Sequence, residues 1–229
     1  MKISIIIPVF NEADTISQLI CYLRENSWKK DRLEIIVIDG QSTDNTREIA
    51  DYCQVAVLSS PYKCRSVQMN LCAGYASGDI LYFLHADSFP PEHFDQYIVN
   101  AVKNGYTSGC FRMRWDKQGW FLSIFSWMTR FNTNLCRGGD QSLFVKAATF
   151  QTIKGFREDF QILEDMEIIP RLRKEGKFAV LPHYLTTSAR RYHENGIIRL
   201  QVLFAVIHLM NIFGVPQHKL FCFYKKYIR

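Results

Sequence analysis

Residues 80–88 read Ile-Leu-Tyr-Phe-Leu-His-Ala-Asp-Ser, and this stretch decides the expected fold. Its first five residues, Ile80–Leu84, are all apolar and predict a strand buried on both faces, as in a parallel sheet. The run ends at His85, Ala86 and Asp87, and open α/β sheets bind ligands beyond such strand ends. Because strand side chains alternate, His85 and Asp87 can face one site. An imidazole with a carboxylate suits a divalent cation, although a plain polar turn explains the same residues.

The chain before this stretch alternates between expected strands and helices. Strands are expected at Ile3–Phe10, Leu33–Ile38 and Val55–Leu58, and helices at Ala13–Asn26, Thr46–Tyr52 and Arg65–Tyr75. Asn11 stands where the N-cap of the first helix belongs. Short connections between alternating strands and helices predict an α/β fold with a mostly parallel central sheet and helices on both faces.

The pattern changes after residue 105. The expected elements are a helix at Pro91–Asn104, a strand at Ser108–Trp115, a helical stretch at Trp120–Asn132, a strand at Ser142–Val145, a helix at Glu164–Glu175 and a strand at Phe178–Leu181. Within Ser108–Trp115, Phe111 and Met113 alternate with Arg112 and Arg114, which predicts a half-buried strand of mixed or antiparallel type. We expect these elements to form a small antiparallel extension of the sheet.

The last segment has a composition of its own. Residues 197–213 are apolar apart from a few positions, but they fall short of the roughly 20 residues that span a bilayer. Gln201, His208 and Asn211 project to one side of a helix, so an amphipathic helix is expected. Aromatic and basic residues follow it, as is typical of a membrane headgroup zone. Peripheral membrane contact through residues 197–229 and packing on the domain remain open alternatives.

Composition limits the class of protein. Of 229 residues, 48% are hydrophobic and 22% charged, as in a globular protein. The net charge of +6 is scattered, so no nucleic-acid partner is expected. Seven cysteines without a C-x-x-C pair indicate reduced thiols in a cytoplasmic protein, at the inner face of the membrane if the C-terminal segment binds lipid. We expect one domain over residues 1–195, divided near residue 105, and a C-terminal segment over 196–229.

Four polar motifs fall at the ends of expected elements. They are Asn11 and Glu12, the stretch from Asp39 to Asp44, the stretch from His85 to Asp87, and Glu164 with Asp165. In order and spacing they resemble family 2 glycosyltransferases, which are inverting enzymes with a Rossmann-like GT-A fold. The likeness covers nearly all of the chain before the C-terminal segment. Residues 65–70, 138–141 and 187–192 resemble more closely a small bacterial subgroup that carries a provisional label of arsenosugar biosynthesis.

The resemblance implies a donor side of the site. Residues 1–105 would hold a nucleotide-diphosphate sugar, with UDP favoured over GDP. The implied donor-binding residues are Pro8, Phe10, Asn11, Glu12, Asp39, Arg65, Asn70, His85, Ala86 and Asp87. Asp87 would bind Mn²⁺ or Mg²⁺ at the diphosphate, with His85 or His193 as candidate further ligands. Gly40 stands where the family often has a second acid, which leaves the recognised base open.

The resemblance also implies an acceptor side over residues 106–195. Asp165 matches the general base that takes the proton of the acceptor hydroxyl, and Glu164 would contact the acceptor or orient Asp165. The implied acceptor-side residues are Gly138, Gly139, Asp140, Gln141 and Arg191. Arg65, Arg190 and Arg191 are candidate partners of the diphosphate oxygens. The acceptor itself is unknown, with a lipid-linked hydroxyl as one candidate.

Two other functions fit parts of the same pattern. A sugar-phosphate nucleotidyltransferase has a related sheet, but it would carry a glycine-rich loop with a basic residue after the first strand, where this chain has Pro8 to Glu12. A catalytically degenerate sugar-nucleotide-binding or membrane scaffold protein would keep the fold and lose the base, whereas Asp87 and Asp165 are both present. A dehydrogenase is disfavoured because no G-x-G-x-x-G follows the first strand.

Overall fold

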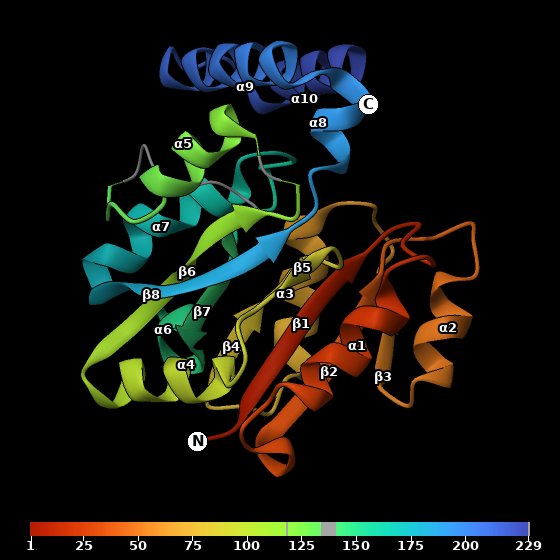
Figure 1. The fold of residues 1–229 in the computed structure, drawn as a ribbon, viewed down its shortest axis with the longest axis vertical. Coiled ribbons are helices and arrows are strands. Elements are labelled where there is room, and N and C mark those ends of the chain that lie inside the picture. Colours follow the sequence, from red (N-terminus) through yellow and green to blue (C-terminus); the bar gives the residue numbers. More distant parts are fainter. Residues whose placement is uncertain (118, 134–140, 229) are drawn as a thin grey trace.

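The strands build one central sheet in the computed structural model, which describes residues 1–117, 119–133 and 141–228 (Figure 1). Within these residues the sheet has eight strands in the order β3-β2-β1-β4-β7-β6-β8-β5. Their bounds are β1 Ile3–Val9, β2 Leu33–Asp39, β3 Ala56–Ser59, β4 Ile80–Phe83, β5 Ser88–Phe89, β6 Tyr106–Trp115, β7 Leu143–Lys146 and β8 Lys177–Thr187.

Helices connect the strands and continue beyond the last one. Their bounds are α1 Ile16–Glu25, a 3₁₀ turn at Lys30–Arg32, α2 Thr46–Tyr52, α3 Arg65–Tyr75, α4 Phe94–Lys103, α5 Trp120–Met128, α6 Ala147–Thr152, α7 Glu164–Glu175, α8 Arg190–Asn195, α9 Ile197–Ile212 and α10 Gln217–Tyr227. The helices pack on both faces of the sheet, so the expected α/β class with a mostly parallel central sheet is confirmed.

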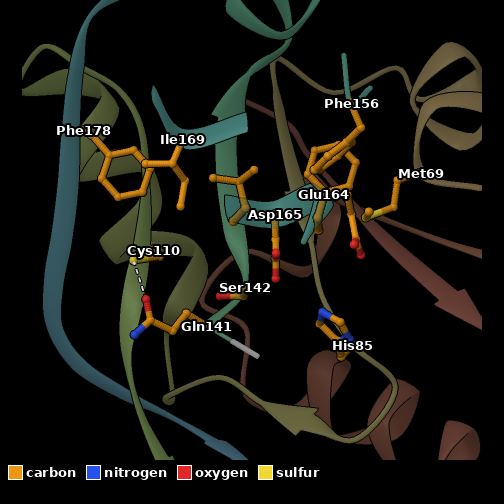
Figure 2. A pocket seen from close by; sticks show the side chains of 12 residues that line it. Met69, His85, Cys110, Gln141, Ser142, Phe156, Glu164, Asp165, Ile169 and Phe178 are labelled. Atoms are coloured by element: carbon orange, nitrogen blue, oxygen red, sulfur yellow. Dashed lines mark hydrogen bonds between the residues drawn. The ribbon is translucent and has the colours of Figure 1, made fainter. Parts of the chain in front are cut away.

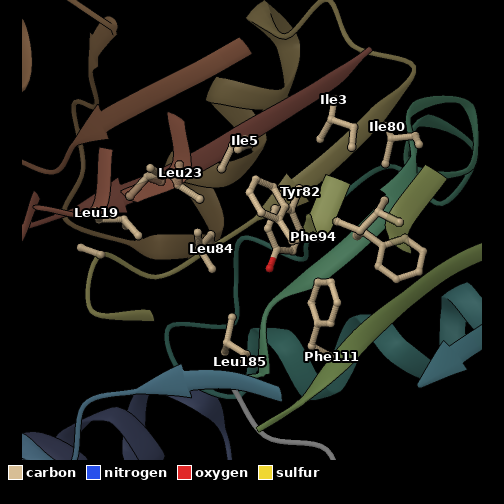
Figure 3. Packing of buried hydrophobic residues seen from close by; sticks show 14 of the residues in the cluster. Ile3, Ile5, Leu19, Leu23, Ile80, Tyr82, Leu84, Phe94, Phe111 and Leu185 are labelled. Atoms are coloured by element: carbon tan, nitrogen blue, oxygen red, sulfur yellow. The ribbon is translucent and has the colours of Figure 1, made fainter. Parts of the chain in front are cut away.

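The parallel half of the sheet is centred on β1. This strand pairs in parallel with β2 and β4, and β3 joins β2 in parallel. Alternate side chains enter two separate cores, with Ile5 and Tyr82 facing α1 and α4, while Ile6 and Phe83 face α3 and α7. Figure 3 shows the first of these cores, in which Tyr82 stacks on Phe94 with ring centroids 5.9 Å apart. Burial on both faces explains the uninterrupted apolar runs of β1 and β4.

A polar clamp ties the amino ends of these strands together. Glu34 on β2 accepts hydrogen bonds from Ser4 of β1 and from the Ser77 hydroxyl at 2.6 Å, and it pairs with the Lys2 ammonium at 3.0 Å. Partial burial raises the pKa of Glu34, but these hydrogen bonds outweigh it and lower the pKa to about 2. The clamp lies opposite the strand ends that carry the polar motifs.

The second half of the sheet is mixed. Strand β7 runs antiparallel to both β4 and β6, and β6 runs parallel to β8. The expected strand at Ser108–Trp115 is of mixed type, as predicted, since β6 pairs with β7 and β8 in opposite senses. Its first part is not half-buried, because Cys110 is buried on one face and Phe111 on the other. The predicted alternation holds from Arg112, which is partly exposed, to Arg114, which is exposed.

Local corrections concern caps and short elements. Asn11 is not an N-cap, because α1 begins at Ile16 and Asn11 adopts a left-handed φ of 53°. Its amide oxygen instead accepts the backbone N–H of Thr43 at 2.9 Å. The last strand, β8, continues six residues past the predicted Leu181 to Thr187. The sequence did not predict β5, α6, α8 or α10, whose apolar patterns are too short to be distinctive.

The C-terminal helices pack on the domain through a third core. Leu200 and Ile207 of α9 and Leu220 of α10 are buried there with Leu122 of α5. Figure 1 shows α9 and α10 side by side at one end of the molecule, next to α5. The expected amphipathic character of α9 is wrong, because its solvent side is also apolar. That side carries Ile198, Val202, Leu209, Ile212 and Phe213. No described helix has both the length and the apolarity needed to cross a membrane.

Candidate active site

Two acidic residues and a histidine line a pocket at the carboxyl ends of the strands (Figure 2). Glu164 and Asp165 lie in the first turn of α7, and His85 follows β4. Gln141 and Ser142, directly before β7, line the opposite side. Apolar side chains complete the wall, among them Met69, Phe83, Phe156, Ile169 and Phe178. The pocket therefore combines a few polar groups with an apolar lining, as small-molecule sites do.

Arg65 joins the two sides of this pocket. Its Nε lies 3.3 Å from Oε1 of Glu164, and its Nη1 lies 3.3 Å from Nδ1 of His85. The Glu164 side chain is 3% exposed, so Arg65 compensates a buried charge. The other oxygen of Glu164, Oε2, is buried and makes no hydrogen bond with the described residues. A ligand hydroxyl entering the pocket would supply the missing donor.

The start of α7 holds Asp165 beside Glu164. Leu163, the residue before the helix, has a left-handed φ of 63°, which turns the chain sharply into the pocket. Asp165 Oδ1 accepts the backbone N–H of Met166 at 2.7 Å. Backbone N–H groups and the helix dipole favour acidic residues at a helix N-terminus, and both acids lie in the first turn of α7.

A second group of predicted residues lies at the ends of β1 and β2. The backbone N–H of Asn11 donates to Ser42 Oγ at 2.9 Å, and that of Glu12 donates to Thr46 Oγ1 at 2.8 Å. Asp39, which is 6% exposed, accepts the backbone N–H of Ser42 at 3.1 Å. These bonds fasten the loop after β1 to the loop after β2 and form one polar edge.

Gln68 explains why a glycine follows Asp39. Its amide nitrogen donates to the carbonyls of Val9 and Ile38, each at 3.1 Å. A Cβ on Gly40 would lie 2.6 Å from that nitrogen, so a side chain there would have to displace the Gln68 amide from these bonds. The second acid that the family often carries at this position is therefore replaced by the Gln68 amide, which ties β1 to β2.

Cations approach the same edge from two other segments. Lys63 Nζ lies 3.0 Å from the ring centroid of Phe10. Pro8, two residues before Phe10, is buried in β1. Burial and the positive charge of Lys225 on α10 lower the pKa of Lys63. From α8, Arg190 Nη2 pairs with Glu12 Oε1 at 3.2 Å. This pair brings the C-terminal segment to the loop after β1.

Arg190 also interacts electrostatically with Asp87. Partial burial lowers the pKa of the Arg190 guanidinium, whereas the charges of Glu12 and Asp87 raise it, and the net direction is upward. The short strand β5 follows Asp87 and pairs with the end of β8 through Ser88 and Thr187. Because α8 follows β8 directly, this pairing brings Asp87 near Arg190.

The model of the family described as Glycosyl transferase family 2 matches residues 4–160. The chain belongs to this family. The provisional arsenosugar subgroup is not confirmed by the comparisons.

Two curated relatives illustrate the match. The succinoglycan biosynthesis protein ExoA of Rhizobium meliloti (strain 1021) is 28% identical over 196 residues, which cover 75% of this chain and 58% of that protein. The uncharacterized glycosyltransferase Rv1514c of Mycobacterium tuberculosis (strain ATCC 25618 / H37Rv) is 35% identical over 179 residues, which cover 74% of this chain and 68% of that protein. This chain thus spans little more than half of ExoA.

Two solved structures share the GT-A fold of this family 2 chain. The mannosyltransferase PcManGT from Pyrobaculum calidifontis, in complex with GDP-Man and Mn²⁺, has a TM-score of 0.64 at 18% identity, covering 81% of this chain and 56% of that one. The glucosyl-3-phosphoglycerate synthase of Mycobacterium tuberculosis, in complex with Mn²⁺, UDP and glucosyl-3-phosphoglycerate, has a TM-score of 0.64 at 18% identity, covering 94% and 81%.

Not every residue predicted from the family motifs lies in the pocket. Asn70 uses its amide to bind the backbone of Phe156 through both its nitrogen, at 2.8 Å, and its oxygen, at 2.9 Å. Ala86 packs into the core of the sheet. Arg191 and His193 lie exposed on α8. Gly138, Gly139 and Asp140 lie outside the described residues.

The sequence motifs did not predict most of the residues that surround the site. Lys63 and the apolar pocket wall carry no motif, because any surface lysine or core residue looks the same in the sequence. Of the three candidate arginines, Arg190 pairs with Glu12. Which of the neighbouring arginines Arg190 and Arg191 faces Glu12 depends on the rotation of α8 about its axis, and its packing sets that rotation.

Proposed function

We propose that this chain is an inverting glycosyltransferase that moves a sugar from a nucleotide-diphosphate donor to an acceptor hydroxyl, with Asp165 as the general base. The observation that carries the proposal is the pocket in which Glu164 and Asp165, at the start of α7, face His85 at the end of β4. Inverting transfer needs one base that takes a proton while the hydroxyl attacks the anomeric carbon. Membership of family 2 supports the same chemistry.

The other residues receive roles from their contacts. Arg65 pairs with the buried Glu164, and we assign to Glu164 Oε2 the role of accepting a hydrogen bond from an acceptor hydroxyl. Arg190 would move from Glu12 toward the donor diphosphate, since Arg–phosphate pairs are stronger than exposed carboxylate pairs. Asn70 acts through the Phe156 backbone as a positioning residue.

The donor base is proposed as uracil in preference to guanine. A carboxylate at the end of β2, Asp39, can accept the uracil N–H or a ribose hydroxyl. The solved GT-A structures include complexes with UDP and with GDP-Man, so both donors suit the fold. Gly40 stands in place of a second acid, and the Gln68 amide lies next to it. We therefore expect this chain to recognise the base without a second carboxylate at this position.

The residues after β4 are compatible with a divalent cation that is bound mainly by the phosphates of the nucleotide-sugar donor. Among the described residues, no three His, Cys, Asp or Glu side chains gather into a metal cluster. Mg²⁺ is commonly bound by one or two carboxylates together with substrate phosphates, and we assign this role to the carboxylate of Asp87. His85 and His193 stay candidates for a further ligand. A bound Mn²⁺ or Mg²⁺ would offset the charge of the departing nucleotide.

Transfer and donor binding can be tested separately. Asp165→Asn should lower turnover by at least about a hundredfold, because a general base contributes that much, while donor affinity stays unchanged. Asp159→Asn is the matched control, since Asp159 is exposed and pairs only with Arg157 among its described neighbours. If Asp165→Asn turns over like this control, the base assignment is wrong.

Donor binding is measured by calorimetric titration with UDP and with GDP, each with and without Mn²⁺, on the wild type and on Asp87→Ala. Metal-dependent binding of one nucleotide that is lost in Asp87→Ala supports the donor site and identifies the base. Metal-independent binding that survives the substitution refutes the role of Asp87. Absence of nucleotide binding under every condition would favour the non-enzymatic scaffold.

Peripheral membrane contact is the second part of the proposal. The solvent side of α9 exposes Ile198 at 71%, Ile212 at 73% and Phe213 at 80%, all on one stripe of the helix. Lys225 and Lys226 follow in the last turn of α10 and complement an anionic surface. Replacing Ile198 and Ile212 by Ser should weaken sedimentation with anionic vesicles. Unchanged sedimentation would refute this contact.

A further inference from the structure

A second hollow lies apart from the candidate active site, between α5 and the end of β6. It has a volume of about 330 Å³, at the lower end of the range of small-molecule sites. Three of its lining residues are cations, Arg114, Lys117 and Arg130, and no acid lines it. Its walls include Trp115 and Trp127, and it shares no lining residue with the pocket of Asp165. We call this hollow the basic groove.

The cations of the basic groove are not neutralised within the described part of the chain. None of the ion pairs found there involves Arg114, Lys117 or Arg130. Arg114 donates through Nε to Thr186 Oγ1, and Arg130 donates through Nε to the Trp127 carbonyl, each at 3.0 Å. These bonds orient both guanidinium groups and use only one of their nitrogens.

The nearest acid in the sequence is engaged elsewhere. Asp116 Oδ1 accepts the backbone N–H groups of Lys117, at 2.7 Å, and of Ala189, at 2.9 Å. Two oriented guanidinium groups with an ammonium are the donor set that binds phosphate oxygens. The groove therefore gathers three cations that make no ion pair with an acid among the described residues.

Two further features point to an organic phosphate. Trp115 is 5% exposed, and its buried indole N–H has no acceptor among the described residues, so the groove wall holds an unmade hydrogen bond. On the outer side of α5, Trp120 is 79% exposed, and Ile124 and Trp127 are each 49% exposed. Their spacing of four and three residues places them on one stripe of the helix. An apolar surface thus adjoins the cations.

We propose that the basic groove binds a phosphate monoester or diester whose organic part lies on this stripe. The site is separate from the donor pocket, and phosphate binding there does not require the transfer reaction. If the proposed function is correct, the phosphate belongs to the acceptor, and this reading of the groove rests on that function. A soluble organic phosphate and a phospholipid headgroup share this chemistry.

The test follows tryptophan emission, since Trp115 and Trp127 line the groove. The full chain is titrated with inorganic phosphate and with glycerol 3-phosphate. It is then mixed with vesicles of equal parts phosphatidylcholine and phosphatidylglycerol, and with vesicles of phosphatidylcholine alone. The variant is Arg114→Gln with Lys117→Gln. The control is Lys103→Gln with Lys174→Gln, which removes two exposed positive charges from α4 and α7.

We expect the half-saturating concentration to rise at least about tenfold in the variant and to stay unchanged in the control, because charge-assisted hydrogen bonds are lost only in the variant. A rise confined to the soluble phosphates identifies a free phosphorylated ligand. A rise confined to the anionic vesicles identifies a lipid headgroup. Equal responses of wild type and variant to every probe would overturn the proposal. Asp165→Asn should bind these probes like wild type, so failure of the groove and failure of the transferase proposal are distinguishable.

Discussion

The most demanding test of the candidate site is the removal of Arg65. Its Nε lies 3.3 Å from a Glu164 carboxylate that is 3% exposed, while Arg65 itself is 33% exposed. At this distance the attraction is about 5 kcal/mol for an effective dielectric constant of about 20. Desolvation and the partial exposure of Arg65 reduce this value. We expect Arg65→Met to lower the free energy of unfolding by about 2–3 kcal/mol at neutral pH, since it leaves a buried charge without its cation.

The assay is urea unfolding followed by circular dichroism, and a double-mutant cycle assigns the loss. In the variant Arg65→Met with Glu164→Gln the buried charge is gone, so most of the lost stability should return. Arg157→Met is the control, because Arg157 and Asp159 are both more than half exposed and such pairs contribute about 1 kcal/mol at most. If Arg65→Met costs no more than Arg157→Met, or if Glu164→Gln does not rescue it, Arg65 does not compensate Glu164.

Three further predictions concern other parts of the chain. Gly40→Ala should lower the unfolding free energy by about 1–3 kcal/mol, because the new Cβ would lie 2.6 Å from the Gln68 amide and displace it. In the same urea assay, the double variant with Gln68→Ala should lose less unfolding free energy than the two single variants lose together. Since hydrogen bonds lower the folded-state pKa of Glu34 from 4.5 to about 2, its stabilisation is complete above pH 4.5 and is lost as the pH falls toward 2. Glu34→Gln should therefore destabilise the protein by about 1–2 kcal/mol at pH 7 and very little at pH 2, and equal losses at both values would contradict the clamp. Arg190→Gln should weaken UDP or GDP binding by about tenfold in calorimetry, since Glu12 is left to repel the diphosphate, with an unchanged melting temperature; unaltered affinity would exclude Arg190 from the donor site.

Local patterns were sufficient for the parallel half of the fold. The helices Thr46–Tyr52, Arg65–Tyr75 and Glu164–Glu175 begin and end where the sequence predicted. Strands with uninterrupted apolar runs, such as Ile80–Phe83, could be identified because burial on both faces leaves no polar position. The sequence also determined that polar residues follow these strands at the carboxyl edge of the sheet.

The sequence could not determine which of these residues meet. Arg65 and Glu164 are 99 positions apart in a chain whose second half is mixed, and their contact depends on the packing of α7 against β6 and β8. Arg190 pairs with Glu12 only because β5 joins β8 and turns α8 toward the first loop. Contacts between distant segments depend on strand order, which local periodicity does not encode.

The C-terminal segment shows the same limit. Its composition determined that α9 forms an apolar helix, and the polar residues on one side suggested an amphipathic one. Only packing against α5 and α10 decided which face is buried, and this left a second apolar face toward solvent. The basic groove likewise exists because α5 closes over the end of β6, where cations that are scattered in the sequence become neighbours. A helix pattern gives the spacing of its side chains, but only its neighbours decide which side is covered.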